Sequence, residues 1–372
     1  MIHTLADLIR IKSVNPAYEG GAPEAHIAAF IREFFCSRGI ECYEQEVFPG
    51  RPNLIARVLG RQPARRVIFE AHVDTASASG MDIPPFEPEI RDGCVYGRGA
   101  CDTKAGLAAM MHALAALHQP PPCEIWVVAA ADEEFSYRGV VRLCEGLTAD
   151  AAVVSEPTDM RLVVATKGCV RFRILARGIA AHSSKPELGR SAIVTMARVV
   201  GALEGHSAAL AKNTHPLLGH ATYNIGTIHG GRQVNIVPDA CAIEIDRRLL
   251  PGEEIDAVLA EYEALLAGLR REYPDLRVEM DPPMLTDYPL ETAAEEPVVV
   301  VAGQVLQQLG LPGSPVGVPY GSDASKLSRA GIPSIVIGPG SIDQAHAAVE
   351  FVDCRQVDQA FEFYRGFMET FE

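Results

Sequence analysis

The sequence lacks the long apolar runs of a membrane protein, since no stretch approaches the roughly 18 apolar residues that a spanning helix needs. Residues 1–11 include Asp7 and Arg10 and form no apolar run, so no signal peptide is predicted. Basic residues are also scarce, because 33 Lys and Arg stand against 48 Asp and Glu, for a net charge of −15. Nucleic-acid binding needs clustered Lys and Arg. We therefore expect neither a membrane nor a nucleic acid as partner.

Paired cysteines are absent as well. The nine cysteines are scattered, odd in number and form no CxxC pair, which argues against a zinc ribbon and against a disulfide framework. Scattered thiols of this kind are typical of a reducing compartment, and we expect a cytoplasmic protein. The glycine-rich residues 97–99 lack both the GxGxxG pattern and the P-loop ending, so they predict no nucleotide site.

The order of the expected elements predicts two domains. A chain of 372 residues is too long for one ordinary core. Over residues 1–167 and 282–372, short apolar strands alternate with helical patterns, which predicts an α/β fold with a mainly parallel sheet and helices on both faces. Residues 168–281 follow the order βαββαβ of a ferredoxin-like unit. We therefore predict a catalytic domain in two parts, 1–167 and 282–372, and an inserted lid and dimerisation domain, 168–281.

Polar residues follow several expected strands, at the sheet edge where α/β proteins bind ligands. His72 ends one strand, and Asp74 stands close enough in sequence to fix the tautomer of that imidazole. Asp102 lies where a strand passes into a helix. Each also has an ordinary interpretation, in which His72 is a hydrogen-bonded turn residue and Asp102 is a helix N-cap.

Further carboxylates gather at the same predicted edge. Asp132, Glu133 and Glu134 follow a buried apolar strand, where adjacent carboxylates need nearby cations unless the turn is simply solvated. Glu156 follows the next strand, and His346 comes after a late Gly-Pro-Gly turn. Together these residues supply the ligand set of a paired zinc site, the clamp used in aminopeptidase-type hydrolysis. A carboxylate beside such ligands can act as general base.

With these motifs the chain resembles, nearly end to end, the co-catalytic zinc family of acetylornithine deacetylase, succinyl-diaminopimelate desuccinylase, aminoacylase and glutamate carboxypeptidase. Further motifs that carry the resemblance are residues 97–106, Ser155-Glu-Pro-Thr158, Ala181-His-Ser-Ser-Lys-Pro186, Asn235-Ile-Val-Pro238, Arg248-Leu-Leu-Pro-Gly252, Gly321-Ser-Asp323 and Ala345-His346. Two segments depart from the family pattern. Thr75-Ala-Ser stands where Val-Pro is common, and Ala347-Ala-Val precedes Glu350 where a carboxylate pair is common. Neither is a ligand position, but both weaken the analogy to any one substrate.

The resemblance implies two metal-ligand sets that share one carboxylate. They are His72, Asp102 and Glu156 for one zinc ion, and Asp102, Glu134 and His346 for the other. It implies that Glu133 is the general base and that Asp74 orients His72. The cofactors are therefore expected to be two zinc ions, with cobalt or manganese as alternatives, because geometry and availability decide the metal more than ligand type does.

The resemblance also assigns roles to the inserted unit, which is similar to a lid that forms a homodimer. It implies that His182 reaches the partner subunit's site and steadies the tetrahedral oxyanion. It implies that Arg248 and Asn235 hold the substrate carboxylate and backbone, and that Gly321 and Ser322 contact substrate. Without the resemblance, His182 is a solvated loop residue, Arg248 a surface ion pair and Asn235 a turn residue.

From these observations we expect a metal-dependent amidohydrolase that cleaves the amide bond of an N-acyl amino acid such as acetylornithine or succinyl-diaminopimelate. The alternative is a metallo-carboxypeptidase or dipeptidase that cleaves short peptides. A third hypothesis is a catalytically idle protein that binds amino-acid derivatives. The complete ligand set together with Glu133 argues against that third hypothesis.

Overall fold

The computed structural model describes the backbone of residues 1–372 and the side chains of all of them except Pro63, Ser207 and Ala208. The chain forms two compact units. The first comprises Met1–Val164, Glu291–Val316 and Ser322–Glu372, and the second comprises Ala165–Leu290 and Gly317–Gly321. Among the helices described, none is both long and apolar enough to cross a membrane.

The first unit is built on a nine-stranded sheet. Its strands run in the order β1-β2-β6-β3-β7-β18-β8-β16, and β17 also pairs with β8. The bounds are β1 (Glu41–Phe48), β2 (Arg51–Val58), β3 (Gln62–His72), β6 (Cys123–Ala130), β7 (Ala151–Val154), β8 (Val163–Thr166), β16 (Leu290–Glu291), β17 (Val316–Val318) and β18 (Ser334–Val336). The central strands β6, β3, β7 and β18 are parallel, whereas β2 and β8 pair antiparallel on either side. The mainly parallel α/β sheet predicted from the sequence is thus confirmed.

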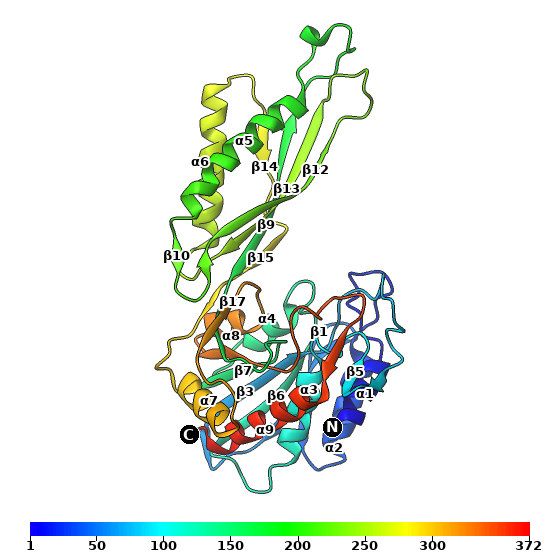
Figure 1. Cartoon of the computed structure of the whole chain (residues 1–372), viewed down its shortest axis with the longest axis vertical. Coiled ribbons are helices and arrows are strands. Elements are labelled where there is room, and N and C mark those ends of the chain that lie inside the picture. Colours follow the sequence, from blue (N-terminus) through cyan, green and yellow to red (C-terminus); the bar gives the residue numbers. More distant parts are fainter. The chain divides into compact units, whose positions relative to one another are not determined.

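Helices cover both faces of this sheet (Figure 1). One face packs against α3 and α9, and the other is covered by α4 and α8. The bounds are α1 (Ile2–Arg10), α2 (Ala25–Cys36), α3 (Lys104–Ala115), α4 (Arg138–Cys144), α7 (Pro297–Gln308), α8 (Ala324–Arg329) and α9 (Cys354–Thr370). Helix α3 is buried almost all round, because its Ala, Leu and Met side chains leave it without a broad polar face. A small sheet of β4 (Glu89–Arg91), β5 (Cys94–Tyr96) and β19 (Phe351–Asp353) completes the unit.

The second unit has the predicted βαββαβ order. Its main sheet runs β12-β13-β9-β14, with β15 also paired to β9, and α5 and α6 pack together on it (Figure 1). The bounds are β9 (Gly168–Arg177), α5 (Ala192–Leu210), β12 (Thr222–Gly230), β13 (Ala240–Leu249), α6 (Ile255–Glu272), β14 (Val278–Met280) and β15 (Leu285–Asp287). A hairpin of β10 (Thr214–His215) and β11 (Gly219–His220) and a 3-10 turn, Pro186–Leu188, are minor additions.

This unit extends further along the chain than the predicted range of 168–281. Pro282 reads as a boundary in the sequence, yet β15 follows it and pairs with β9 from Arg171 to Cys169. The unit therefore continues to Leu290 and also takes in Gly317–Gly321. A short strand after a proline carries little local signal, and only its pairing partner reveals it.

Candidate metal centre

Three neighbouring parallel strands deliver polar residues to one edge of the first sheet. They are β6, β3 and β7, adjacent in that order. The acidic turn follows β6, His72 is the last residue of β3, and Glu156 comes two residues after β7. Because the carboxyl ends of parallel strands share one edge, residues far apart in sequence are brought together here.

His72 is held in the tautomer that a metal ligand needs. Its side chain is buried, and its Nδ1 lies 2.9 Å from the backbone carbonyl oxygen of Asp74. A carbonyl only accepts, so Nδ1 carries a proton, and in the neutral ring the lone pair that can bind a metal is on Nε2. The carboxylate of Asp74 is further from Nδ1, at 3.7 Å. The tautomer is therefore set mainly by the main chain of Asp74 and not by the side chain that the sequence suggested.

Asp102 stands between two imidazoles. Its Oδ1 is 3.0 Å from Nε2 of His72, and its Oδ2 is 3.4 Å from Nε2 of His346. Nε2 of His346 also lies 3.1 Å from Glu134. One oxygen of the Asp102 carboxylate thus faces each histidine, which is the arrangement of a bridging ligand.

The spacing suits a divalent metal. Ligand atoms of His72, Asp102 and Glu134 lie within 4.8 Å of one another. Two ligands of one tetrahedral zinc ion, each at about 2.0–2.2 Å from it, are roughly 3.3 Å apart. The distances on either side of Asp102 bracket that value, so the nitrogen and oxygen donors present fit a divalent metal site.

Glu133, which is partly buried, and Glu156, which is buried, complete the acidic group. Oε2 of Glu133 is 3.9 Å from Nε2 of His72, and Glu156 is buried within electrostatic reach of His72 and Asp102. Burial raises the pKa of both carboxyls well above the usual range, and neighbouring carboxylates raise it further. Crowded buried carboxylates favour positive charge among them, whether from protons or from metal ions.

The pKa values of the two histidines are raised as well, but by the neighbouring carboxylates and not by burial. Burial lowers the pKa of His72, but its hydrogen bond to Asp102 and the charges of Glu133 and Glu156 outweigh this and raise it. Hydrogen bonds to Asp102 and Glu134 raise the pKa of His346 to about 10. The same two imidazoles hold the pKa of Asp102 below its usual value, although burial alone would raise it. The electrostatics of the centre therefore favour bound cations, either protons or metal ions.

In the inserted unit, His182 and Asn235 come together although they are far apart in sequence. The N–H of Ser183 donates to the carbonyl of Asn235 at 3.0 Å, and the backbones of His182 and Ile236 form an isolated antiparallel β-bridge. The N–H of Ser184 donates to Nδ1 of His182 at 3.1 Å. Because Nδ1 accepts, neutral His182 carries its proton on Nε2, and this exposed ring offers Nε2–H as a donor.

Arg248 lies at the other end of the same sheet. Arg248 is near the end of β13 and pairs with Cys169 of β9, which also pairs with β15. The loop that contains Asn235 precedes the start of β13. The 10 residues of β13 span roughly 30 Å at about 3.3 Å each. Nε of Arg248 lies 2.7 Å from the carboxylate of Asp246. The predicted substrate residues Arg248 and Asn235 are therefore not brought together within one chain.

The last two predicted substrate contacts are differently placed. Ser322 is fully buried in the first unit and offers no surface to a ligand in this conformation. Gly321 belongs to the second unit, where a Cβ atom would meet the carboxylate of Asp287 at 1.9 Å. This close approach is a structural reason for glycine at position 321, whatever its role with substrate.

Several residues that support the centre were not anticipated from the sequence. Glu350 is fully buried and accepts the N–H groups of Cys101 (2.9 Å) and Asp102 (3.1 Å), while Arg98 donates to its other oxygen at 2.6 Å. Asn15 donates to Asp74. Nothing in the local sequence marks Glu350, which follows three apolar residues, or Asn15, which precedes a proline, as a supporting residue, because their partners are remote in sequence.

Comparison with known proteins gives consistent matches. Residues 68–370 match the sequence profile described as peptidase family M20/M25/M40. The acetylornithine deacetylase of Myxococcus xanthus is 33% identical over 270 residues, which cover 70% of this chain and 68% of that protein.

Solved structures extend the likeness to the whole fold. The aminopeptidase PepT of Bacillus cereus superposes with a TM-score of 0.80 at 24% identity, covering 99% of this chain and 97% of that one. The YXEP protein of Bacillus subtilis, a dinuclear metal-binding peptidase of the M20 family, superposes with a TM-score of 0.75 at 16% identity, covering 99% and 96%. At these identities the superpositions establish the fold.

Proposed function

Since the chain belongs to peptidase family M20/M25/M40 and is a hydrolytic enzyme that acts on amides, we propose that it removes the acyl group from a small N-acyl amino acid. The acetylornithine deacetylase of Myxococcus xanthus is the relative that supports this choice. Acetylornithine-like and succinyl-diaminopimelate-like compounds are the first substrates to examine. The alternative is cleavage of short peptides, which the fold shared with an aminopeptidase supports.

The observation that carries the proposal is the placement of Asp102 with one oxygen toward each histidine. We propose His72, Asp102 and Glu156 as ligands of one ion, and Asp102, Glu134 and His346 as ligands of the other. Two divalent ions in this place would supply a nucleophilic water of low pKa and polarise the scissile carbonyl. Zinc is proposed because nitrogen and carboxylate donors suit it, with cobalt or manganese as alternatives.

Glu133 is proposed as the general base. It lies beside the ligands, and its raised pKa, caused first by burial, suits a group that takes a proton from water and returns it to the leaving amine. His182 is proposed to donate its Nε2–H to the oxyanion, and Arg248 to bind the substrate carboxylate in bidentate fashion. Asn235, Gly321 and Ser322 are kept as proposed substrate contacts, Ser322 only if the buried segment around it rearranges.

The separation of His182 from Arg248 supports a homodimer. These side chains belong to opposite ends of one sheet, and a single N-acyl amino acid is much shorter than β13. If both contact one substrate, one of them must come from a second copy. We therefore propose that the inserted unit forms a two-fold dimer in which His182 serves the partner subunit's site.

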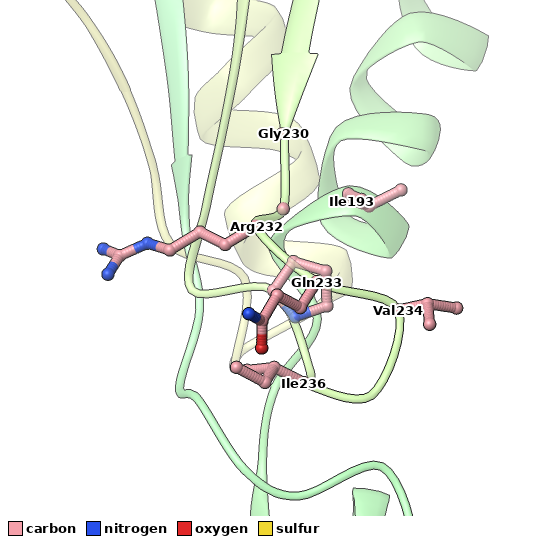
Figure 2. Close-up of a pocket in the computed structure, with 8 residues that line it drawn as sticks. Ile193, Gly230, Arg232, Gln233, Val234 and Ile236 are labelled. Carbon is pink, nitrogen blue, oxygen red and sulfur yellow. The ribbon is translucent and has the colours of Figure 1, made fainter.

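The surface of the inserted unit supports the same proposal. Strand β12 is an edge strand, whose unpaired main-chain groups can bind another strand. Exposed apolar side chains surround a hollow of ≈ 430 Å³ beside it, among them Ile193, Val234 and Ile236. Figure 2 shows the loop between β12 and β13, with Ile193 and Val234 on one side of it and Arg232 pointing away from them. Such apolar patches mark interaction surfaces.

The thiols support a reducing compartment, and we propose the cytoplasm. All nine cysteines are free in the structure, and four are buried. Burial raises the pKa of thiols such as Cys101 and Cys169, so these groups behave as core residues rather than as reactive thiolates.

The deciding experiment combines metal analysis with a substrate panel. Purified protein is assayed for metal per chain and for hydrolysis of N-acetyl and N-succinyl amino acids and of dipeptides, before and after chelation. Glu133→Gln is compared with Glu145→Gln, an exposed glutamate of the same unit. We expect about two metals per chain, acyl-amino-acid turnover that chelation abolishes, and a loss of about 10²–10⁴ in kcat in Glu133→Gln only.

Other results have defined meanings. Metal-free protein that cannot be reconstituted would refute the two-metal centre. Turnover of dipeptides but not of acyl amino acids would replace the deacylase with the peptidase. An unchanged kcat in Glu133→Gln would require another base.

A further inference from the structure

The turn that carries Glu133 and Glu134 is anchored on the side chain of Asp74. Oδ1 of Asp74 accepts the N–H of Glu133, and Oδ2 accepts the N–H of Glu134, each at 3.1 Å. Asp132, which precedes them, has a φ of 68°, a left-handed conformation uncommon outside glycine. Consecutive N–H groups beside a left-handed residue point into one concavity that binds an anion. The Asp74 carboxylate fills this role, so its position fixes the backbone of the proposed base and of one proposed ligand.

Asp74 is itself held in place by Asn15. The Asn15 side chain is fully buried, and its Nδ2 donates to Oδ2 of Asp74 at 2.7 Å and to Oδ1 of Asp132 at 3.0 Å. An amide nitrogen has two protons, one for each carboxylate. Two buried like charges otherwise repel, and a buried carboxylate without a donor is costly. The opposite orientation of the amide would place Oδ1 against two carboxylates, so the observed orientation is the only favourable one.

The segment that carries Asn15 is locked onto the strand end. The N–H of Asn15 donates to the carbonyl of Thr75, and the N–H of Thr75 donates to the carbonyl of Ser13, both at 2.9 Å. Asp132 is also neutralised by Arg51, whose Nη2 lies 2.8 Å from it. Asn15 and Arg51 both lie outside residues 68–370, the range that matches the family profile.

We propose that Asn15 is a positioning residue for the metal centre. By donating to Asp74 and Asp132 at once, it sets the distance between the end of β3 and the turn after β6. That distance fixes where Glu133 and Glu134 stand relative to His72. The inference rests on the proposed two-metal function and adds to it a residue from the N-terminal segment.

The test uses Asn15→Leu, which keeps the volume but removes the donor, and Asn15→Asp, which keeps the shape but replaces the donor with an acceptor. Thr292→Val is the matched control, because Thr292 is a buried hydrogen-bonding residue of the same unit that lies directly after β16, away from Asn15 in the sequence. The readouts are thermal unfolding, Co²⁺ titration of the metal-free protein followed by its visible spectrum, and kcat and KM of the reconstituted enzyme.

We expect both Asn15 variants to bind the second, more weakly bound Co²⁺ ion about 10–100-fold less tightly than the wild-type protein does. Loss of a partner that orients metal ligands commonly has an effect of this size. We expect a similar fall in kcat, an altered Co²⁺ spectrum and an unchanged KM, while Thr292→Val loses only thermal stability. Wild-type Co²⁺ affinity and kcat in either folded Asn15 variant would overturn the inference. Failure of both variants to fold would assign Asn15 to the stability of the unit and would equally overturn it. Wild-type protein that binds two Co²⁺ ions without hydrolysing any amide would instead refute the proposed function, and the affinity comparison would still test Asn15.

Discussion

The two units of the chain place their charged residues differently. The first unit buries many of them, including Glu70, Asp74, Arg98, Lys104 and Glu350. The inserted unit buries few, and its arginines mostly form ion pairs at the surface, as Arg173 does with Asp281 and Arg177 with Glu279. Its exposed side chains include large apolar residues of β12, of α5 and of the loop after β12, namely Ile228, Ile193, Val194, Val234 and Ile236.

This difference indicates that the two units serve the protein in different ways. Buried charges destabilise a fold unless they are paired, so their concentration near one sheet edge of the first unit marks the place where chemistry is built. The inserted unit has an ordinary apolar core and an unusual surface. Its contribution is therefore expected at that surface, and equal substitutions in the two units should have unequal effects.

The largest contrast is expected between two aspartates. Asp102→Asn should prevent metal binding at both positions, because a carboxamide does not bridge two cations. Loss of a metal contribution of several kcal/mol lowers kcat/KM on the order of a thousandfold. Asp281→Asn in the inserted unit should change neither metal content nor kcat/KM, since its ion pair with Arg173 is at the surface. Metal analysis and steady-state kinetics of both variants measure the contrast, and equal losses would abolish it.

The next contrast concerns ion pairs and stability. Arg98→Met leaves the buried carboxylate of Glu350 without its partner and should cost about 3–5 kcal/mol of unfolding free energy. Arg173→Met, which breaks a surface pair, should cost less than about 1 kcal/mol. Denaturant unfolding of the metal-free proteins gives both values. The double variant Arg98→Met/Glu350→Gln should regain part of the loss, and no recovery would show that the charge of Glu350 is not the cause.

A third experiment asks whether the inserted unit acts across a dimer. His182→Ala and Glu133→Gln should each be inactive alone. After mixed refolding, half of the dimers carry one of each chain and have one intact site, so about a quarter of the wild-type activity should return. No recovery in mixtures that contain mixed dimers, as verified by mass spectrometry, would place His182 and Glu133 in the same subunit's site.

The smallest effect concerns acid stability in the first unit. Burial lowers the pKa of His112 to about 4, and its ring contacts Thr4 at 2.8 Å. Between about pH 6.5 and 4 the unfolded chain binds a proton that the folded chain excludes, so stability falls as the pH falls through this window. His112→Gln should reduce the loss of unfolding free energy between pH 7 and pH 4 by about 2 kcal/mol. Unfolding of the metal-free proteins at pH 7 and pH 4 measures it, and equal acid losses in both would contradict the prediction.

Much of the fold could be predicted from the sequence because its patterns are local. The βαββαβ order of the inserted unit and the alternating strands and helices around it follow from periodicity over short windows. The clustering of polar residues at one edge of the sheet could also be predicted, because the carboxyl ends of parallel strands lie at the same edge. The end of the inserted unit could not be placed, since β15 is recognisable only through its pairing with β9.

By itself the sequence determined the chemical types present: two histidines and several carboxylates after apolar strands, in a chain with a net charge of −15. Only the tertiary structure decided how they act together. It placed one oxygen of Asp102 toward each of His72 and His346, closed the turn of Glu133 on Asp74, and put Asn15 between two carboxylates. The reason is physical. Hydrogen bonds and electrostatic interactions depend on separations of a few ångströms, and these partners lie up to hundreds of residues apart along the chain, where no local pattern records them.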